Sequence, residues 1–144
     1  MPDPFDLQRF AAAQDSVYPQ VLAELAVGRK RSHWMWFIFP QLAGLGFSAM
    51  AQRYAISGMA EAHAYLDDPL LGARLRECSA LVLAVKGSSA HGIFGTPDDM
   101  KFHSSMTLFS LAAPQEPVFR GCLDQYFGGM PDQATLSILK QGAP

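Results

Sequence analysis

The chain has 144 residues, of which 49% are hydrophobic and 17% are charged, and its formal net charge is −2. This length suits a single domain, residues 1–144, that buries roughly 70% of the surface its unfolded chain would expose. A composition this rich in hydrophobic residues excludes disorder over most of the chain. Because the net charge is slightly negative, the protein has no overall positive electrostatic potential, and we expect no nucleic-acid partner.

Cysteine content and the length of apolar runs bear on the cellular setting. Cys78 and Cys122 fall on apolar faces of predicted helices, where we expect buried thiols and neither a disulfide framework nor a metal site. No apolar run reaches the roughly 20 residues of a membrane span. Asp3 and Asp6 stand where a signal peptide would be basic. We therefore expect a cytoplasmic protein without membrane contact, metal or cofactor.

Apolar residues recur at helical spacing along most of the chain. Alternation typical of strands is scarce, and Asn-Gly hairpin turns are absent. We predict an all-α fold, a compact irregular array of about seven or eight short helices. One apolar run, residues 34–39, fits either a buried helical turn or a buried strand. In chain order the helical stripes cover residues 7–14, 18–25, 48–56, 59–66, 71–82, 100–111, 119–126 and 136–139.

Residues that suit helix ends mark the boundaries of these helices. Proline fits the first turn, and glycine fits the position just after the last turn. Short polar side chains fit the N-cap, where an oxygen accepts a hydrogen bond from a free backbone amide. The candidate N-caps are Ser16, Ser57, Thr96 and Asp132, the first-turn prolines are Pro19, Pro69, Pro97 and Pro117, and the candidate ends are Gly28, Gly87 and Gly128.

The first candidate site is the segment 33–41, which follows the basic triplet Arg29-Lys30-Arg31. Cations suit a phosphate or carboxylate, indole rings suit stacking on a base, and a glutamine amide suits polar edges. Two purely structural alternatives stay open. The cations can complement the dipole of the preceding helix, and the aromatic side chains can be part of the hydrophobic core. The candidate residues here are His33 for catalysis and Lys30, Trp34, Trp36 and Gln41 for ligand binding.

The second candidate site is the segment 98–107. One helical turn places Asp98 beside Lys101, and Ser104 and Thr107 follow on roughly the same face. Such a face suits a polar ligand, with a carboxylate as general base. The alternative is a capped helix with an intrahelical ion pair and small residues that permit close packing. The candidate residues here are Asp99 for catalysis and Lys101 and Ser105 for ligand binding.

Standard catalytic patterns are missing from the sequence. It contains no Gly-x-Ser-x-Gly elbow, no P-loop, no dinucleotide-binding Gly-x-Gly-x-x-Gly and no His-Glu-x-x-His. His63, His91 and His103 have no spacing that suggests metal ligands. Any function must therefore rest on a site without a familiar motif.

Several strings resemble one known family. Residues 30–41, KRSHWMWFIFPQ, the following LAGLGFSAMAQRYAI, and the later YLDDPLLGARLREC, IFGTPDDMKFHSSMTLF and DQATLSIL resemble a bacterial family called Domain of Unknown Function 1810. The resemblance covers nearly the whole chain and implies an all-helical fold, with no established reaction. Members are sometimes labelled calpastatin-like, but calpastatin-type inhibitors are disordered and polar, whereas this chain is apolar and periodic.

Two classes of function remain. The first is a small-molecule binding protein or hydrolase for a nucleotide-like ligand, with Trp34 or Trp36 on the base and Arg29, Lys30 or Lys101 on the phosphates. The segment 98–107 is also similar to helical proteins that act on ADP-ribose N-glycosides, which need a carboxylate beside a developing oxocarbenium ion. The second class is a non-catalytic interaction module or homodimer with an aromatic contact surface. A shared concave pocket would favour the first, and a flat exposed aromatic patch the second.

Overall fold

The computed structural model describes residues 3–141, and these residues form ten helices and no strand. The all-α prediction is confirmed. Seven of the helices have eight residues or more, and the other three are short turns of four or five residues. In chain order they are α1 (Gln8–Asp15), α2 (Tyr18–Ala26), α3 (Met35–Ile38), α4 (Ala49–Arg53), α5 (Met59–Asp67), α6 (Pro69–Ala84), α7 (Ala90–Phe94), α8 (Asp98–Ala112), α9 (Pro117–Phe127) and α10 (Gln133–Gln141).

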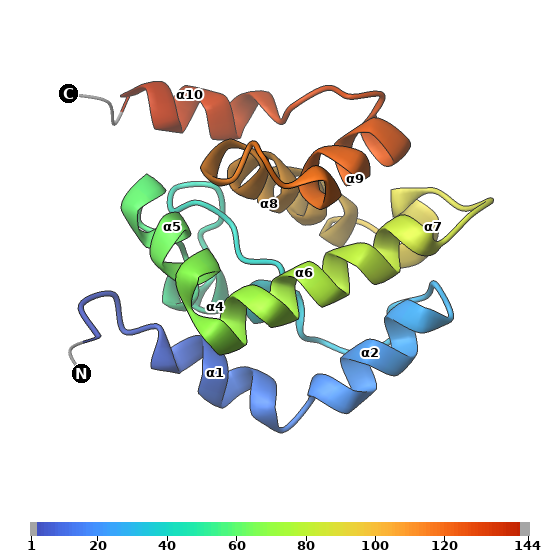
Figure 1. Cartoon of the computed structure of the whole chain (residues 1–144), viewed down its shortest axis with the longest axis horizontal. Helices are drawn as coiled ribbons and strands as arrows, with labels where there is room; N and C mark the ends of the chain where they lie inside the picture. The colour runs from blue at the N-terminus through green and yellow to red at the C-terminus, as the bar shows by residue number, and fades with distance from the viewer. Residues whose placement is uncertain (1–2, 142–144) are drawn as a thin grey trace.

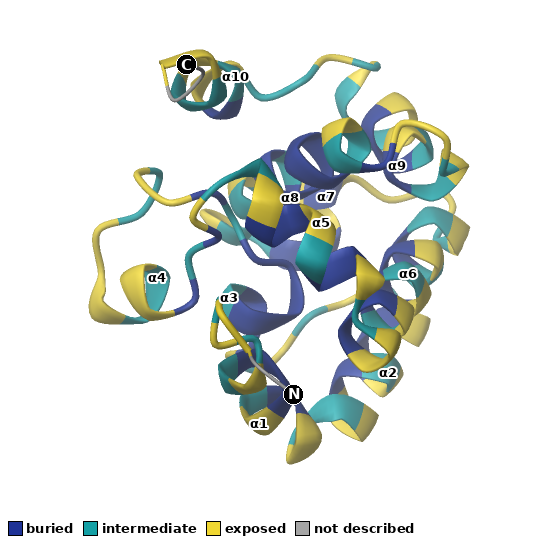
Figure 2. Cartoon of the chain, turned by 60° about the vertical axis from the view of Figure 1, so that its left-hand side comes forward, coloured by how far each residue is buried: buried dark blue, intermediate teal, exposed yellow. Residues whose placement is uncertain are grey.

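The two longest helices, α6 and α8, organise the packing. In Figure 1, α6 crosses the front of the molecule, with α1 and α2 below it and α8, α9 and α10 above it. Helix α6 packs against α2, α5 and α9, and α8 packs against α5, α7, α9 and α10. Figure 2 shows α4 and α10 at the margins of the molecule. No residue of α4 is buried, and Thr135 is the one buried residue of α10.

The apolar run 34–39 is a helical turn, α3, and lies in the core. Trp34 is 1% exposed and Phe39 is fully buried. The ring of Phe39 meets Phe102 of α8 edge-on, with ring centroids 5.0 Å apart, and meets Phe94 of α7 at 5.9 Å. Phe94 and Phe102 stack at 4.7 Å. Edge and offset contacts of this kind add specificity to apolar burial, so this run fastens α7 and α8 to the rest of the core.

Helix ends follow the sequence signals only in part. Asp132 caps α10 by accepting a hydrogen bond from the Thr135 amide, and Gly128 ends α9 in the left-handed region with φ 62°. Pro69 opens α6, as predicted. Gly28 and Gly87, with φ 74° and 77°, lie two and three residues beyond the last helical residues of α2 and α6.

Three predicted N-caps are wrong. Ser16 keeps helical backbone angles at the end of α1, so it cannot adopt the extended cap conformation before α2. Gly58 intervenes between Ser57 and α5, and Glu61 reaches back to accept from the Ser57 amide. Helix α8 begins one residue later than predicted, after Pro97. Thr96 is therefore free to hydrogen-bond through Oγ1 to His91 Nδ1 at 3.0 Å.

The two cysteines are free, buried thiols, as predicted. Both lie in the core, Cys78 on α6 and Cys122 on α9. Burial raises the pKa of each thiol to about 12, so neither is a thiolate at neutral pH.

A buried carboxylate, Glu24, orders the loop between α2 and α3. Its Oε1 accepts hydrogen bonds from the Arg31 amide at 2.8 Å, the Ser32 amide at 3.1 Å and the Trp34 indole at 3.0 Å. Its Oε2 accepts from the Ser32 hydroxyl and from Gln20 Nε2. Burial raises the pKa of Glu24, but the hydrogen bonds outweigh burial and leave the pKa at about 2.

We predict that replacing Glu24 by Gln removes an acid-sensitive part of the stability. The folded-state pKa of about 2 lies below the ordinary 4.5, so the carboxylate stabilises the fold above about pH 4.5. This contribution, of order 3 kcal/mol, is lost as the pH falls toward 2. At pH 7 Glu24→Gln should lower the free energy of unfolding by about 2 kcal/mol. The difference from wild type should shrink on acidification, in urea titrations from pH 7 to 2.

The control is Asp124→Asn, which alters an exposed carboxylate paired with Arg120 within α9. This variant should differ from wild type by less than about 0.5 kcal/mol at each pH, because exposed ion pairs contribute little. A constant gap between Glu24→Gln and wild type from pH 7 to 2 would contradict the role given to Glu24.

Candidate functional site

The two segments predicted to carry chemistry meet in space at two points. Lys30 Nζ lies 2.8 Å from Asp98 Oδ2, and the Lys30 amide donates to the Ile93 carbonyl at 2.8 Å. Farther along, Gln41 Nε2 donates to Ser104 Oγ at 2.6 Å. The basic and aromatic segment therefore lies along the first two turns of α8.

Two lysines share one carboxylate at the first of these points. Asp98 Oδ1 lies 3.6 Å from Lys101 Nζ, which is longer than the 2.8 Å contact between Asp98 and Lys30. The side chain of Lys30 is 7% exposed, whereas that of Lys101 is 23% exposed. With two lysines and one carboxylate the cluster has a net charge of +1, and Lys101 is its more exposed cation.

The ammonium group of Lys101 lies over the ring of Trp36. The Nζ of Lys101 lies 5.3 Å from the centroid of the Trp36 ring, within the range of a cation–π contact. The Trp36 side chain is half-buried, and its Nε1 is buried with no hydrogen-bond partner among residues 3–141. The ring therefore acts as a platform that limits where the ammonium group can lie.

Lys101 and Gln41 line a cavity of about 260 Å³. Its walls come from three places: the loop before α4, the first two turns of α8, and the start of α10. Ser104 and Asp132 are the other polar residues of the lining, and the remaining lining residues are apolar. The lining residues are Gln41, Leu45, Gly46, Pro97, Met100, Lys101, Ser104, Asp132 and Ala134.

Asp132 is the residue that the sequence analysis missed as a site residue, although it predicted the cap. It caps α10 through Oδ2 and is also one of the residues that line the cavity. The local sequence signals only the cap. Its proximity to Lys101, 31 positions earlier, follows from the packing of α10 on α8.

Two predicted ligand-binding residues lie inside the core. Trp34 is 1% exposed, and its Nε1 donates to Glu24 at 3.0 Å. Ser105 is fully buried, and its hydroxyl has no partner among the described residues. Neither side chain can touch a ligand in this structure, because α3 and α8 turn both of them inward.

The other predicted site residues lie apart from the cavity wall. Lys30 points to Asp98 and is nearly buried. Asp99 Oδ2 lies 3.7 Å from His91 Nδ1, and His33 is exposed. His33, Asp99 and Lys30 are not among the lining residues.

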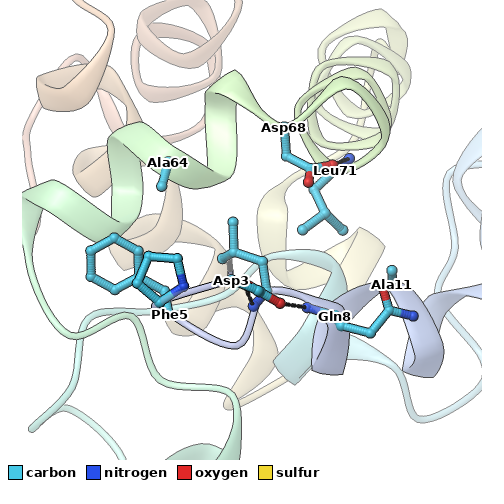
Figure 3. A pocket seen from close by; sticks show the side chains of 9 residues that line it. Asp3, Phe5, Gln8, Ala11, Ala64, Asp68 and Leu71 are labelled. Carbon is cyan, nitrogen blue, oxygen red and sulfur yellow. Dashed lines mark hydrogen bonds between the residues drawn. The ribbon is translucent and has the colours of Figure 1, made fainter. Parts of the chain in front are cut away.

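Two further cavities offer less chemistry. A cavity of about 480 Å³ lies between the N-terminal segment, α5 and α6 (Figure 3). Its two carboxylates, Asp3 and Asp68, already accept from backbone amides at the starts of α1 and α6, and no Lys, Arg or His lines it. In a third cavity, of about 240 Å³, Arg76 and Glu116 neutralise each other at 2.5 and 2.9 Å. We therefore place the candidate site at Lys101.

Residues 3–141 contain no group of three or more His, Cys, Asp or Glu side chains placed to hold a metal ion. Across this described range, no helix is both long and apolar enough to span a bilayer.

These features define an all-α protein with a small cavity, mostly apolar in its lining, between α8, α10 and the loop before α4. Residues 4–139 match the family described as protein of unknown function (DUF1810), and the chain belongs to that family. Its fold is similar to the crystal structure of the conserved hypothetical protein Rv1873 from Mycobacterium tuberculosis. The two are 54% identical, with a TM-score of 0.94, over 96% of this chain and 99% of that one. No curated protein matches the chain.

We predict that the Lys30–Asp98 pair couples the two segments energetically. Asp98→Asn leaves Lys30 nearly buried without an anion, so it should lower the free energy of unfolding by about 2 kcal/mol or more. Lys30→Met should cost less, because Asp98 keeps Lys101 and the methionine keeps the apolar stem. The double variant should recover at least about 1 kcal/mol relative to the sum of the single changes, measured by urea unfolding. Strict additivity would show that the pair does not join the segments.

Proposed function

We propose that this protein binds a small, phosphorylated, nucleotide-like ligand in the cavity lined by Lys101 and Gln41. The observation that carries the proposal is the net positive charge of the cluster formed by Lys30, Lys101 and Asp98, because its more exposed ammonium group, on Lys101, attracts an anionic group. A phosphate fits this requirement. Trp36 holds the ammonium in place and thereby reduces the cost of ordering it on binding.

The other lining groups suit the rest of such a ligand. Gln41 donates to Ser104 through Nε2, and none of the described residues donates to its Oε1. That oxygen is available to an amino or hydroxyl group. Leu45, Pro97 and Met100 offer apolar surface for a flat ring. The volume of about 260 Å³ lies just below the roughly 300–1,000 Å³ of most ligand pockets, which favours a mononucleotide or sugar phosphate.

Binding is the core of the proposal, and hydrolysis is an extension of it. Catalysis at an N-glycosidic bond needs a carboxylate beside the developing oxocarbenium ion. Asp132 is the one carboxylate in the lining set, so it takes this role if the ligand is cleaved. A catalytic role for His33 and Asp99 stays a prediction from sequence.

We predict that adenosine 5′-monophosphate, ADP-ribose or a sugar phosphate raises the thermal unfolding midpoint. At 100 times its dissociation constant a ligand stabilises by about 2.7 kcal/mol, or roughly 5 to 15 °C for a domain of this size. Mass spectrometry of each ligand afterwards would reveal any cleavage. Lys101→Met should remove the shift caused by phosphorylated ligands.

The matched control is Lys86→Met, the same change at an exposed lysine that hydrogen-bonds Gln125 and lies outside the cavity. This variant should keep the ligand-induced shift. No shift with any phosphorylated ligand, or an equal shift in Lys101→Met, would overturn the proposal.

A homodimer is the second candidate function. The aromatic run 34–39 is mostly in the core, so the aromatic contact surface would have to come from elsewhere. Phe47 is 81% exposed and follows the cavity residue Gly46 in sequence, and Met100, 66% exposed, lines the same cavity. Large exposed apolar side chains of this kind favour an interface.

We predict that, if this surface forms the dimer, sedimentation at micromolar concentration shows a dimer in wild type and a monomer in Phe47→Ser. The variant should keep its thermal midpoint at low protein concentration, because Phe47 lies outside the core. A monomeric wild type would reject this second function.

A further inference from the structure

We infer that residues 43–52 form a lid over the cavity, and that Phe47 at the tip of the lid covers the flat ring of the bound ligand. This inference rests on the proposed function, because it gives the base of a nucleotide-like ligand a second contact. Leu45 and Gly46 of this segment already line the cavity, and Phe47 comes next in sequence. Phe47 is 81% exposed, so its ring is free to take a new partner.

The lid packs loosely on the rest of the protein. No residue from 43 to 53 is buried, and Figure 2 shows α4 and the loop before it at the margin of the molecule. Leu45 and Met50 are partly buried against the core. Segments with few buried apolar contacts have low local stability, and the lids of binding sites belong to this class. The lid can therefore move while the core stays folded.

Both ends of the lid are fixed. The Ala43 amide donates to the Ile56 carbonyl at 2.8 Å, and Arg9 Nε donates to the Arg53 carbonyl at 2.8 Å. Just inside the first anchor, Gly44 has φ 98°, in a region that residues with a Cβ rarely adopt. A hinge needs few residues that absorb a change in backbone angles. Gly44 meets this requirement, so the tip can swing while the ends stay in place.

The tip of the lid is held together by its own contacts. Gln52 Nε2 donates to the Phe47 carbonyl at 2.7 Å, and the Ala51 amide donates to Ser48 Oγ at 3.1 Å. A Cβ added to Gly46 would lie 2.7 Å from the Cβ of Ala51, so the loop lies directly against α4. The tip therefore moves as one piece and carries Phe47 with it.

A flat ring is the partner that suits Phe47 in the closed position. With the phosphate on Lys101, one face of the base lies against the apolar side chains of Leu45 and Met100. Closure places the phenyl ring on the other face and removes apolar surface from water. Stacking on an aromatic side chain tolerates every base, because each base has a π-face. The lid therefore selects a ligand that has a base, whichever base it is.

The test compares adenosine 5′-monophosphate with ribose 5-phosphate, which lacks the base, by isothermal titration calorimetry. Wild type should bind the nucleotide at least about ten-fold more tightly, since stacking on one aromatic side chain has this worth. Phe47→Ala should weaken binding of the nucleotide about ten-fold and leave ribose 5-phosphate unchanged. The control Leu111→Ala, at an exposed apolar residue outside the cavity lining, should keep both affinities.

Closure has a separate measurement, hydrogen exchange of the amides in residues 43–52. Saturating adenosine 5′-monophosphate should slow this exchange at least about three-fold in wild type, and ribose 5-phosphate should leave it unchanged. Both measurements are made below the protein concentration at which sedimentation detects a dimer, because a homodimer would use the same side chain.

The other outcomes separate the two proposals. Equal affinity of wild type for the two ligands, or equal effects of Phe47→Ala on both, overturns the ring contact while the proposed function stands. Unchanged exchange in the presence of the nucleotide overturns the lid. If neither ligand binds to wild type, the proposed function fails and the inference fails with it.

Discussion

The buried carboxylate of Glu24 is the interaction on which the arrangement of the site depends. Five donors converge on it, and most come from the loop that links α2 to α3. Without this acceptor the amides of Arg31 and Ser32 would be left unpaired near the core, which is costly. Because the loop is fixed at its far end, Lys30 at its near end is directed onto Asp98. Lys101 lies near the other oxygen of the Asp98 carboxylate, at 3.6 Å.

Buried charge in so apolar a chain therefore serves positioning more than stability. A nearly buried ion pair such as Lys30–Asp98 contributes little net free energy, because desolvation offsets the attraction. Its effect is geometric, since it joins two segments that are 68 positions apart in sequence. The second connection, Gln41 to Ser104, repeats this at the cavity wall. The aromatic run between these points fills the core, so the polar contacts lie at its two ends.

The fold could be predicted from sequence because its main determinant is local. Apolar spacing along each helix records which face is buried, and the stripes at 18–25 and 71–82 lie in α2 and α6. Helix ends were harder to predict from sequence. A cap residue needs an extended backbone, and the conformation of the neighbouring residues can prevent it. Ser16 fails for that reason, whereas Asp132 directly precedes α10 and its Oδ2 accepts from the Thr135 amide. The sequence could not decide whether Trp34 lies in the core or contacts a ligand, because indole rings are common in both places.

The candidate site was only half predictable, for a physical reason that Asp132 illustrates. Lys101 and Gln41 were proposed from residue type, and both line the cavity. Asp132 has the sequence environment of an ordinary cap, and it lines the cavity only because α10 packs on α8 beside the loop before α4. Helix α10 has one buried residue, Thr135, and supplies one wall of the cavity. A ligand bound in this cavity would contact both α8 and α10, so binding would stabilise the packing of these two helices.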